Sequence, residues 1–351
     1  MCVAPVPAIA IVYEGIEAGS YRAENATGGD TQVGDQFEGG EENQLTGRIQ
    51  SLAVFGSETI LLLCCYYPVT TLLSPMKLWR LLLFLIGWWA VFQSGHRAAL
   101  ISVVMFMVLT GYFHRGIMEI SKMALLFLPV LLILVAGNGT FFELPGTAQR
   151  ALSFLPGNWS HAAEGSATAS TEWRVEMWKR ALTGNKYIKN KVLGDGFGYN
   201  RREFETVVSA QNRGVDMGQE GLMVFGQFHS GPVSAIRYVG VLGLVLYYVF
   251  KFYLAIYSWK LVRRAKGTPL FVMALLNCTS AIIGPFFFTF LAAGFDGDLP
   301  GTILNAGMIK TVKQTLDDYE EENKNLQQSK LNQIDDPFQL STPNPLAAAH
   351  A

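Results

Sequence analysis

"KMALLFLPVLLILVAG", residues 122–137, begins with a lysine and then runs for fifteen residues without a charged side chain. A helix needs about 20 predominantly apolar residues to cross the hydrocarbon core of a bilayer, and this run approaches that length. The stretch therefore predicts a transmembrane helix and an integral membrane protein.

Further apolar runs occur on both sides of this stretch and set the number of predicted spans. Together with it, they lie at residues 52–73, 78–94, 97–113, 122–137, 232–259 and 269–294. The composition agrees with a membrane protein, because only 16% of the residues are charged, against about 25% in soluble domains. We predict an all-α membrane protein with about six transmembrane helices.

The composition also argues against two kinds of partner. A net charge of -1 does not suit nucleic-acid binding, which needs a basic surface. The cysteines have neither metal-ligand spacing nor the pattern of a disulfide framework; they are Cys2, Cys64, Cys65 and Cys278. The histidines form no His, Cys and Asp cluster with metal spacing either. We expect neither a metal ion nor another cofactor.

Basic residues in short loops predict the orientation of the spans, because such loops remain in the cytoplasm. The loops after the first, third and fifth spans hold Lys77, Arg80, Arg115, Lys122, Lys260, Arg263, Arg264 and Lys266. The alternate short loop, SGHR, holds only Arg97. The three basic loops are predicted to be cytoplasmic, and the long segment 138–231 is predicted to face outward.

These assignments divide the chain into five parts. They are 1–50, a flexible acidic segment facing outward; 51–137, four transmembrane helices; 138–231, a large outer loop; 232–296, two transmembrane helices; and 297–351, a polar C-terminal tail. The first part lacks the basic and apolar regions of a signal peptide. This indicates either translocation of the N-terminal tail or further spans upstream. The number of spans puts the C-terminal tail outside, unless residues 300–311 re-enter the membrane.

Two outward-facing stretches carry arginines at the predicted membrane boundary. "SGHRAALISVV", residues 94–104, opens the third span with Arg97, and Ser94 is a candidate N-cap. "STEWRVEMWKRALTGN", residues 170–185, has the spacing of an amphipathic helix that carries Arg174, with Ser170 or Thr171 as its cap. The alternative for both is an arginine that contacts lipid phosphates at the bilayer surface.

A third stretch, "QFHSGPVSAIRYVGVLG", residues 227–243, opens the fifth span. Ser230 fits the N-cap and Pro232 fits the first helical turn. His229 then lies outside the positive end of a helix, which attracts anions and keeps the imidazole neutral and able to act as a base. Arg237 lies about two turns further along and needs an anionic or carbonyl partner. A histidine in this position also occurs for purely structural reasons.

At these residues the chain resembles the bacterial O-antigen ligase and polymerase family, which are membrane glycosyltransferases that use lipid-linked glycans. "SGHRAAL" is similar to the Ser-x-Ser-Arg-Gly stretch of the family, and "TEWRVEMWKRAL…KVLGDGFG" to its Arg-x-x-x-Trp segment and Gly-rich turn. "HSGPVSAIRYVGVLG" is similar to its His-Asn segment, and "GRIQSLAVFGSETILLL" to a segment before an earlier span. His96, Ala98 and Ser230 depart from these patterns. The similarity covers roughly residues 46–300.

The resemblance implies a helical bundle of the GT-C type in the bacterial inner membrane, with its active site at the periplasmic face. Arg97 and Arg174 would bind the diphosphate of an undecaprenyl-diphosphate-linked oligosaccharide or polysaccharide, and we expect Arg237 to contact the same diphosphate. His229 would act as the base that deprotonates a hydroxyl on a glycan, lipid or protein acceptor. The reaction would be metal-independent and inverting. Family members have ten or more spans, so six indicate a truncated or divergent chain.

Two other classes of function remain open. The chain is alternatively a non-enzymatic transporter or a protein that binds lipids or anions, with its arginines along an anion path. It is otherwise an inactive fragment of the family. Transporters often contain internal repeats and broken helices, and the sequence shows no repeat.

Overall fold

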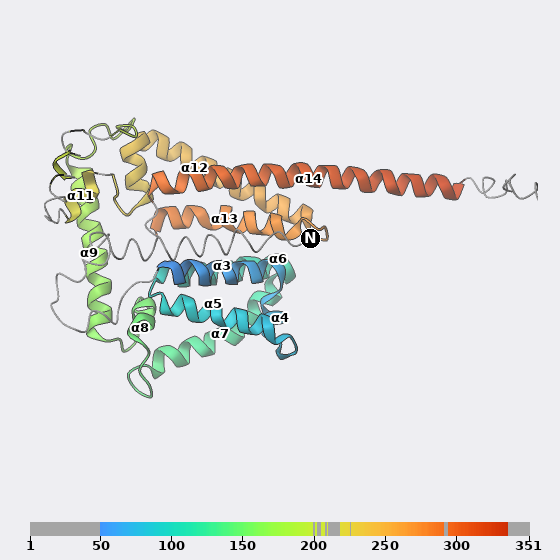
Figure 1. Cartoon of the computed structure of the whole chain (residues 1–351), viewed down its shortest axis with the longest axis horizontal. Coiled ribbons are helices and arrows are strands. Elements are labelled where there is room, and N and C mark those ends of the chain that lie inside the picture. The colour runs from blue at the N-terminus through green and yellow to red at the C-terminus, as the bar shows by residue number, and fades with distance from the viewer. Residues whose placement is uncertain are drawn as a thin grey trace, which may run out of the picture.

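The computed structural model describes residues 50–198, 201, 205–207, 209, 218–224, 226–290 and 294–335. These residues form helices and no β-strand (Figure 1). The helices are α3 (Gln50–Tyr66), α4 (Val69–Leu72), the 3-10 helix η2 (Pro75–Lys77), α5 (Leu78–Gln93), α6 (Arg97–Arg115), α7 (Ile117–Gly137), α8 (Gly146–Leu152), α9 (His161–Thr183), α11 (Gly218–Val224), α12 (Gly231–Ala265), α13 (Phe271–Phe290) and α14 (Phe295–Asp335). The prediction of an all-α protein is confirmed for the described part of the chain.

Among the described residues, five helices are long and apolar enough to cross a membrane. They are Pro75–Gln93, Arg97–Arg115, Ile117–Gly137, Gly231–Ala265 and Phe271–Phe290. Many of their apolar side chains point out of the bundle; on α7, Leu125 is 79% exposed and Ile133 is 64% exposed. Such surfaces need an apolar solvent, so the protein is a multi-pass membrane protein that lies in a lipid bilayer.

The first of the six predicted spans, residues 52–73, differs in the structure. Its helix, α3, has 17 residues and ends at Tyr66, because Pro68 disfavours helical geometry at the residue before it. At about 1.5 Å per residue, α3 is about 25 Å long, which is short for a bilayer core of about 30 Å. It packs closely on α5: a Cβ added to Gly56 would lie 2.6 Å from the Gly87 carbonyl oxygen.

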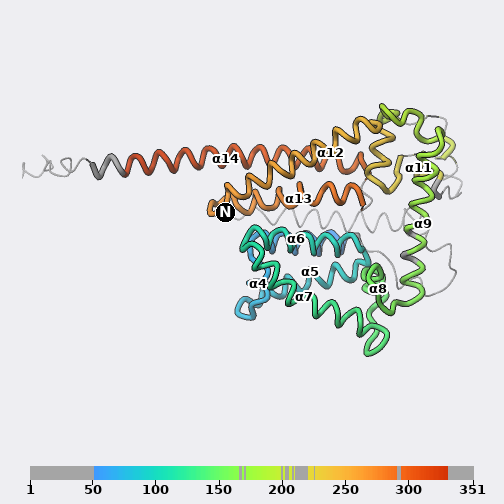
Figure 2. Tube along the Cα trace, turned by 180° about the vertical axis from the view of Figure 1, so that it is seen from behind, coloured from blue at the N-terminus to red at the C-terminus, as the bar shows by residue number. Residues whose placement is uncertain are grey.

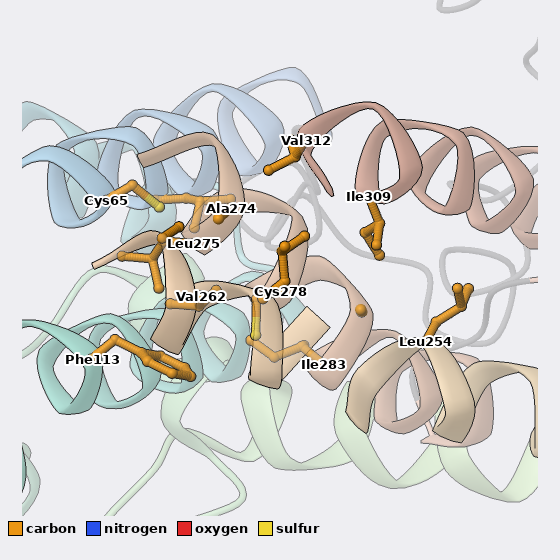
Figure 3. Close-up of a cluster of buried hydrophobic side chains, with 14 of the residues drawn as sticks. Cys65, Phe113, Leu254, Val262, Ala274, Leu275, Cys278, Ile283, Ile309 and Val312 are labelled. Atoms are coloured by element: carbon orange, nitrogen blue, oxygen red, sulfur yellow. The ribbon is translucent and has the colours of Figure 1, made fainter. Parts of the chain in front are cut away.

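The C-terminal part of the chain also differs from the predicted polar tail. Helix α14 begins at Phe295 and continues without interruption to Asp335. Its first half belongs to the bundle, since Ile309, Val312 and Leu316 are buried in the same apolar core as residues of α12 and α13. Figure 3 shows Ile309 and Val312 facing this core. The second half projects beyond the bundle (Figure 1).

The turns that carry the basic residues lie together at one end of the bundle. The turns between α3 and α5, between α6 and α7, and between α12 and α13 lie at one end of the bundle (Figures 1 and 2). Helices α8, α9 and α11, which belong to the predicted outer loop, lie at the opposite end. Helix α14 leaves the bundle at the end with the basic turns (Figure 1), whereas a chain of six spans would put its tail at the other end.

Candidate functional site

Helix α9 crosses the end of the bundle where α6 and α12 begin (Figures 1 and 2). Its N-cap is Ser160, whose hydroxyl accepts a hydrogen bond from the Ala163 amide at 3.3 Å. The predicted cap at Ser170 or Thr171 was therefore wrong, because the helix begins about ten residues earlier and both lie inside it. The apolar face of α9 is fixed at Met177 and Ala181, which are fully buried against Met223 and Phe228.

The start of α12 follows the prediction closely. Ser230 is the N-cap, with its hydroxyl accepting from the Val233 amide, and Pro232 lies in the first turn. His229, the residue before the cap, has a φ of 47°, a left-handed conformation that non-glycine residues rarely adopt. Backbone strain of this kind is often found at functional sites.

The contacts that hold His229 come from α9. The ring centroid of Trp173 lies 5.4 Å from that of His229. One turn further along, the Trp178 indole donates a hydrogen bond to the Phe228 carbonyl at 2.7 Å. Arg174 is the neighbour of Trp173 on the same helix and is half-buried. The structure thus brings the helix that carries Arg174 against His229.

Arg97 lies at the same end of the bundle but beside a different element. It is the first residue of α6, and its Nε donates to the Arg150 carbonyl of α8 at 3.1 Å. The predicted cap at Ser94 was wrong: His96 occupies the N-cap position without a side-chain cap bond. The Ser94 hydroxyl instead donates to the Val91 carbonyl and accepts from the His96 amide. Arg97 is therefore oriented by α8, whereas His229 is oriented by α9.

Arg237 has anionic and carbonyl partners, as expected for an arginine within an apolar span. Its Nη1 lies 3.2 Å from Asp195 Oδ2 and donates to the Tyr187 carbonyl at 2.8 Å. Its Nη2 reaches the Gly198 carbonyl at 3.5 Å. The guanidinium is thus engaged by the loop that follows α9, which differs from the expected contact with a donor diphosphate.

The same loop forms hydrogen bonds with the backbone of α12 on both sides of a break in that helix. Gly240 has a φ of 70°, which interrupts the helix. The freed carbonyls of Arg237 and Tyr238 accept from the amides of Asp195 and Gly196, at 2.7 and 3.0 Å. On the other side of the break, the amides of Val241 and Leu242 donate to the carbonyls of Lys191 and Val192.

The Gly-rich stretch GDGFG, residues 194–198, supplies two of the amides in these contacts. Gly194 has a φ of 79°, and a Cβ added to it would lie 2.5 Å from the Tyr238 carbonyl oxygen. The Asp195 carboxylate accepts from the amides of Lys189 and Asn190, both at 2.8 Å. The amides of Asp195 and Gly196 in this stretch are therefore engaged by carbonyls of α12.

A polar contact joins the loop after α9 to α11. The Glu220 carboxylate accepts hydrogen bonds from the Lys186 ammonium and, at 2.6 Å, from the Tyr187 hydroxyl. Partial burial opposes the charged form of Glu220, but these two donors outweigh it and lower its pKa. The hydrogen bond to Glu220 in turn raises the pKa of Lys186.

Sequence reasoning missed a second group of ionisable residues within the bundle. The Lys251 ammonium of α12 lies 2.7 Å from the Asp298 carboxylate of α14, next to a cavity of about 410 Å³. Lys251 interrupts the apolar run 232–259 and is visible there in the sequence. Its partner is not, because Asp298 lies in a segment that reads as a polar tail.

In the described part of the chain, no group of three or more His, Cys, Asp and Glu side chains is arranged to hold a metal ion. The candidates for chemistry are thus the arginines and the histidine at the α9 end, and the Lys251 and Asp298 pair. No family model, no curated protein and no solved structure matches this chain.

Proposed function

We propose that the protein transfers a glycan from an undecaprenyl-diphosphate carrier to an acceptor hydroxyl at the outer face of the bacterial inner membrane, as an O-antigen ligase or polymerase does. The observation that carries this proposal is the strained His229 at the mouth of α12, with Trp173 of α9 against its ring. Arg174 is adjacent to that tryptophan on the same helix, and its guanidinium supplies a positive charge there.

Each step of the reaction has a residue of suitable chemistry. The His229 imidazole takes the proton of the acceptor hydroxyl, and the hydroxyl oxygen attacks the anomeric carbon of the donor sugar. The bond from that carbon to the diphosphate breaks, and the carrier leaves as a diphosphate. Arg97 and Arg174 neutralise the charge that develops on it, because a guanidinium makes paired contacts with phosphate oxygens. Attack opposite to the leaving group inverts the configuration of the sugar.

Arg237 takes a different part in the proposal. Its contacts with Asp195 and the Tyr187 carbonyl hold the loop after α9 against the start of α12. That loop follows α9, which carries Arg174, and it contacts α12, which begins just after His229. Arg237 is therefore a positioning residue, whose loss would change the relative placement of the other groups.

The test is a transfer assay on membranes that contain the full chain and a lipid-linked glycan. His229→Gln removes the base and is expected to lower consumption of the donor by about 10²–10⁴-fold. Arg97→Ala and Arg174→Ala are expected to lower it as well, and Arg174→Lys is expected to be poor because a point charge replaces a planar fork. Lys179→Ala, an exposed cation on the same helix, is the matched control.

Each variant must also insert into the membrane in normal amounts. If the His229→Gln variant inserts and consumes donor at the normal rate, His229 is not the base. If Arg174→Ala behaves like Lys179→Ala, the diphosphate is not bound by α9.

One observation favours a second candidate, a transporter. Transporter sites are often built from discontinuous helices, whose freed backbone groups bind the substrate, and α12 is broken at Gly240. The freed groups next to this break are, however, bonded to the loop 191–196. Uptake of a labelled glycan-free anion into vesicles that contain the protein, without any transfer of glycan, would favour the transporter over the transferase.

A further inference from the structure

A charged and polar cluster is buried between α12, α13 and α14. Lys251 is 4% exposed, and its ammonium lies 2.7 Å from Asp298 Oδ2. The Tyr247 hydroxyl donates to the same oxygen and lies 2.9 Å from the Thr302 hydroxyl. The Lys251 ammonium also lies over the rings of Tyr247 and Phe288, at 5.2 and 5.3 Å from their centroids.

A buried ion pair is an energetically costly contact between two helices. Removing a cation and a carboxylate from water costs several kcal/mol for each ion, and apolar side chains of similar size often pack at lower free energy. Ionisable residues within membrane helices are accordingly rare and usually mark a binding site or a pathway. The pair between α12 and α14 therefore calls for an explanation beyond packing.

A cavity of about 410 Å³ lies next to the pair, which is in the range of small-molecule sites. Its lining comes from α12, α13 and α14 and includes Lys251, Ser280, Gly284, Asp298, Thr302 and Asn305. A Cβ added to Gly284 would lie 3.4 Å from the Lys251 ammonium, so this glycine keeps room beside the charge. The cavity thus has the Lys251 and Asp298 pair on one wall and free space beside that pair.

The rim of the cavity lies on the outside of the bundle. Ser280, Gly297 and Gly301 are exposed, although they line the cavity. Ile303 and Leu304, which follow on α14, are 58% and 66% exposed. A surface of this kind faces lipid in a membrane, so a ligand enters the cavity from the bilayer and carries an apolar part.

The hydrogen-bonding groups of the cavity define the polar part of the ligand. Asn305 Oδ1 is buried and has no hydrogen-bond partner among the described residues, and it needs a donor. Its amide nitrogen is used by the Asn277 carbonyl at 3.4 Å. The Lys251 ammonium has three donors and one carboxylate contact, so it needs an acceptor.

The charges of Lys251 and Asp298 cancel each other, so an ion of either sign would meet a like charge in the cavity. A neutral group that both donates and accepts fits this pair and the Asn305 oxygen together. The hydroxyls of a sugar ring are groups of that kind. We propose that this cavity binds the sugar headgroup of a neutral glycolipid from the surrounding bilayer.

This site is separate from the proposed transfer reaction and does not depend on it. Its lining contains no arginine, and the ligand carries no diphosphate. His229→Gln is therefore expected to leave glycolipid binding unchanged, and failure of one proposal does not decide the other.

The test uses the full chain in phosphatidylcholine nanodiscs that contain equal small amounts of three probe lipids. The probes are monoglucosyldiacylglycerol, diacylglycerol with the same acyl chains, and phosphatidylethanolamine. Native mass spectrometry of the released protein measures which lipid remains bound. We expect retention of the glucolipid to exceed that of the other two by about tenfold, the factor that one hydrogen bond provides. Equal retention of all three lipids, or preference for phosphatidylethanolamine, would overturn the assignment.

Two variants connect the binding to this cavity. Asn305→Leu removes the buried oxygen that has no partner and also the long 3.4 Å hydrogen bond from the Asn305 amide to the Asn277 carbonyl. These two effects oppose each other, so the thermal stability of the empty protein is expected to change little while the preference for glucolipid falls about tenfold. Ser280→Leu, at the rim, narrows the entrance from the bilayer without touching the ion pair. Gly307→Ala on α14, with no atom within 4 Å of the new Cβ, is the control. Full preference for glucolipid in both cavity variants would contradict the proposal.

Discussion

The guanidinium of Arg237 and the carboxylate of Asp195 lie 3.2 Å apart, and their side chains are 10% and 13% exposed. One belongs to α12 and the other to the loop after α9, 42 residues earlier in the chain. The pair lies next to the break at Gly240, where the backbone amides of the same loop satisfy the freed carbonyls of the helix. The loop and the first turns of α12 therefore form one structural unit.

Asp195→Ala is expected to destabilise this unit strongly. It leaves the buried charge of Arg237 without its carboxylate, a loss of about 3–5 kcal/mol for a buried pair. It also removes the acceptor of the Lys189 and Asn190 amides. The double variant Asp195→Ala with Arg237→Met is expected to lose less than the sum of the two single variants, because no charge is left buried. Unfolding by SDS in mixed micelles measures the three free energies, and strict additivity would contradict a direct interaction.

Gly240→Ala is expected to disrupt the same unit through the backbone. A φ of 70° with a ψ of -179° is accessible essentially to glycine alone, and a new Cβ would lie 2.1 Å from the Val192 carbonyl oxygen. We expect a loss of about 3 kcal/mol or more, measured in the same unfolding assay. Gly307→Ala, inside α14 and free of close atoms, is expected to stabilise the protein by about 0.4–1 kcal/mol. Equal effects of the two substitutions would mean that α12 is not broken at Gly240.

Local patterns predicted the individual helices well and their tertiary partners poorly. The apolar run 122–137 and the Ser230 and Pro232 start of α12 follow from period, length and capping, which are properties of neighbouring residues. The partner of Lys251 could not be found in this way, because Asp298 lies 47 positions away in a stretch of ordinary polarity. The cap at Ser160 was missed since the polar run after it, residues 161–169, carries no apolar period.

The contact between the loop after α9 and α11 is expected to weaken in acid. The pKa of Glu220 is lowered in the folded protein, so its carboxylate contributes stability above its ordinary pKa of 4.5 and loses it as the pH falls through the lower folded value. Hydrogen exchange of the α11 amides, corrected for the intrinsic pH dependence of exchange, measures this loss. Protection is expected to fall below pH 4.5 in the wild type and to be low and independent of pH in Glu220→Gln. Glu176→Gln, which removes an exposed contact with Arg180, should titrate like the wild type.

The C-terminal end of α14 is expected on the same side of the membrane as the turn between α12 and α13. Arg264, next to that turn, donates to Glu320 of α14 at 2.7 Å, and the helix continues outward from there. In a Cys2→Ser background, an impermeant thiol reagent should label Leu326→Cys and Lys266→Cys from one side and Glu164→Cys of α9 from the other. The native Cys64, Cys65 and Cys278 are buried and serve as an internal blank. Labelling of Leu326→Cys together with Glu164→Cys would contradict the course of α14.

The backbone of His229 provides a measurement that separates its conformation from its chemistry. Ala and Gly both lack the imidazole and the contact with Trp173, and they differ only in the Cβ that the left-handed region disfavours. His229→Gly is therefore expected to be more stable than His229→Ala by about 1 kcal/mol, read as a higher melting temperature. His229→Asn, which tolerates this region, should lie between them. If the imidazole is the base, all three variants lose glycan transfer to a similar extent although their stabilities differ. Equal stability of the Gly and Ala variants would mean that the residue has a negative φ in the membrane, and the geometry that favours His229 as the base would then be absent.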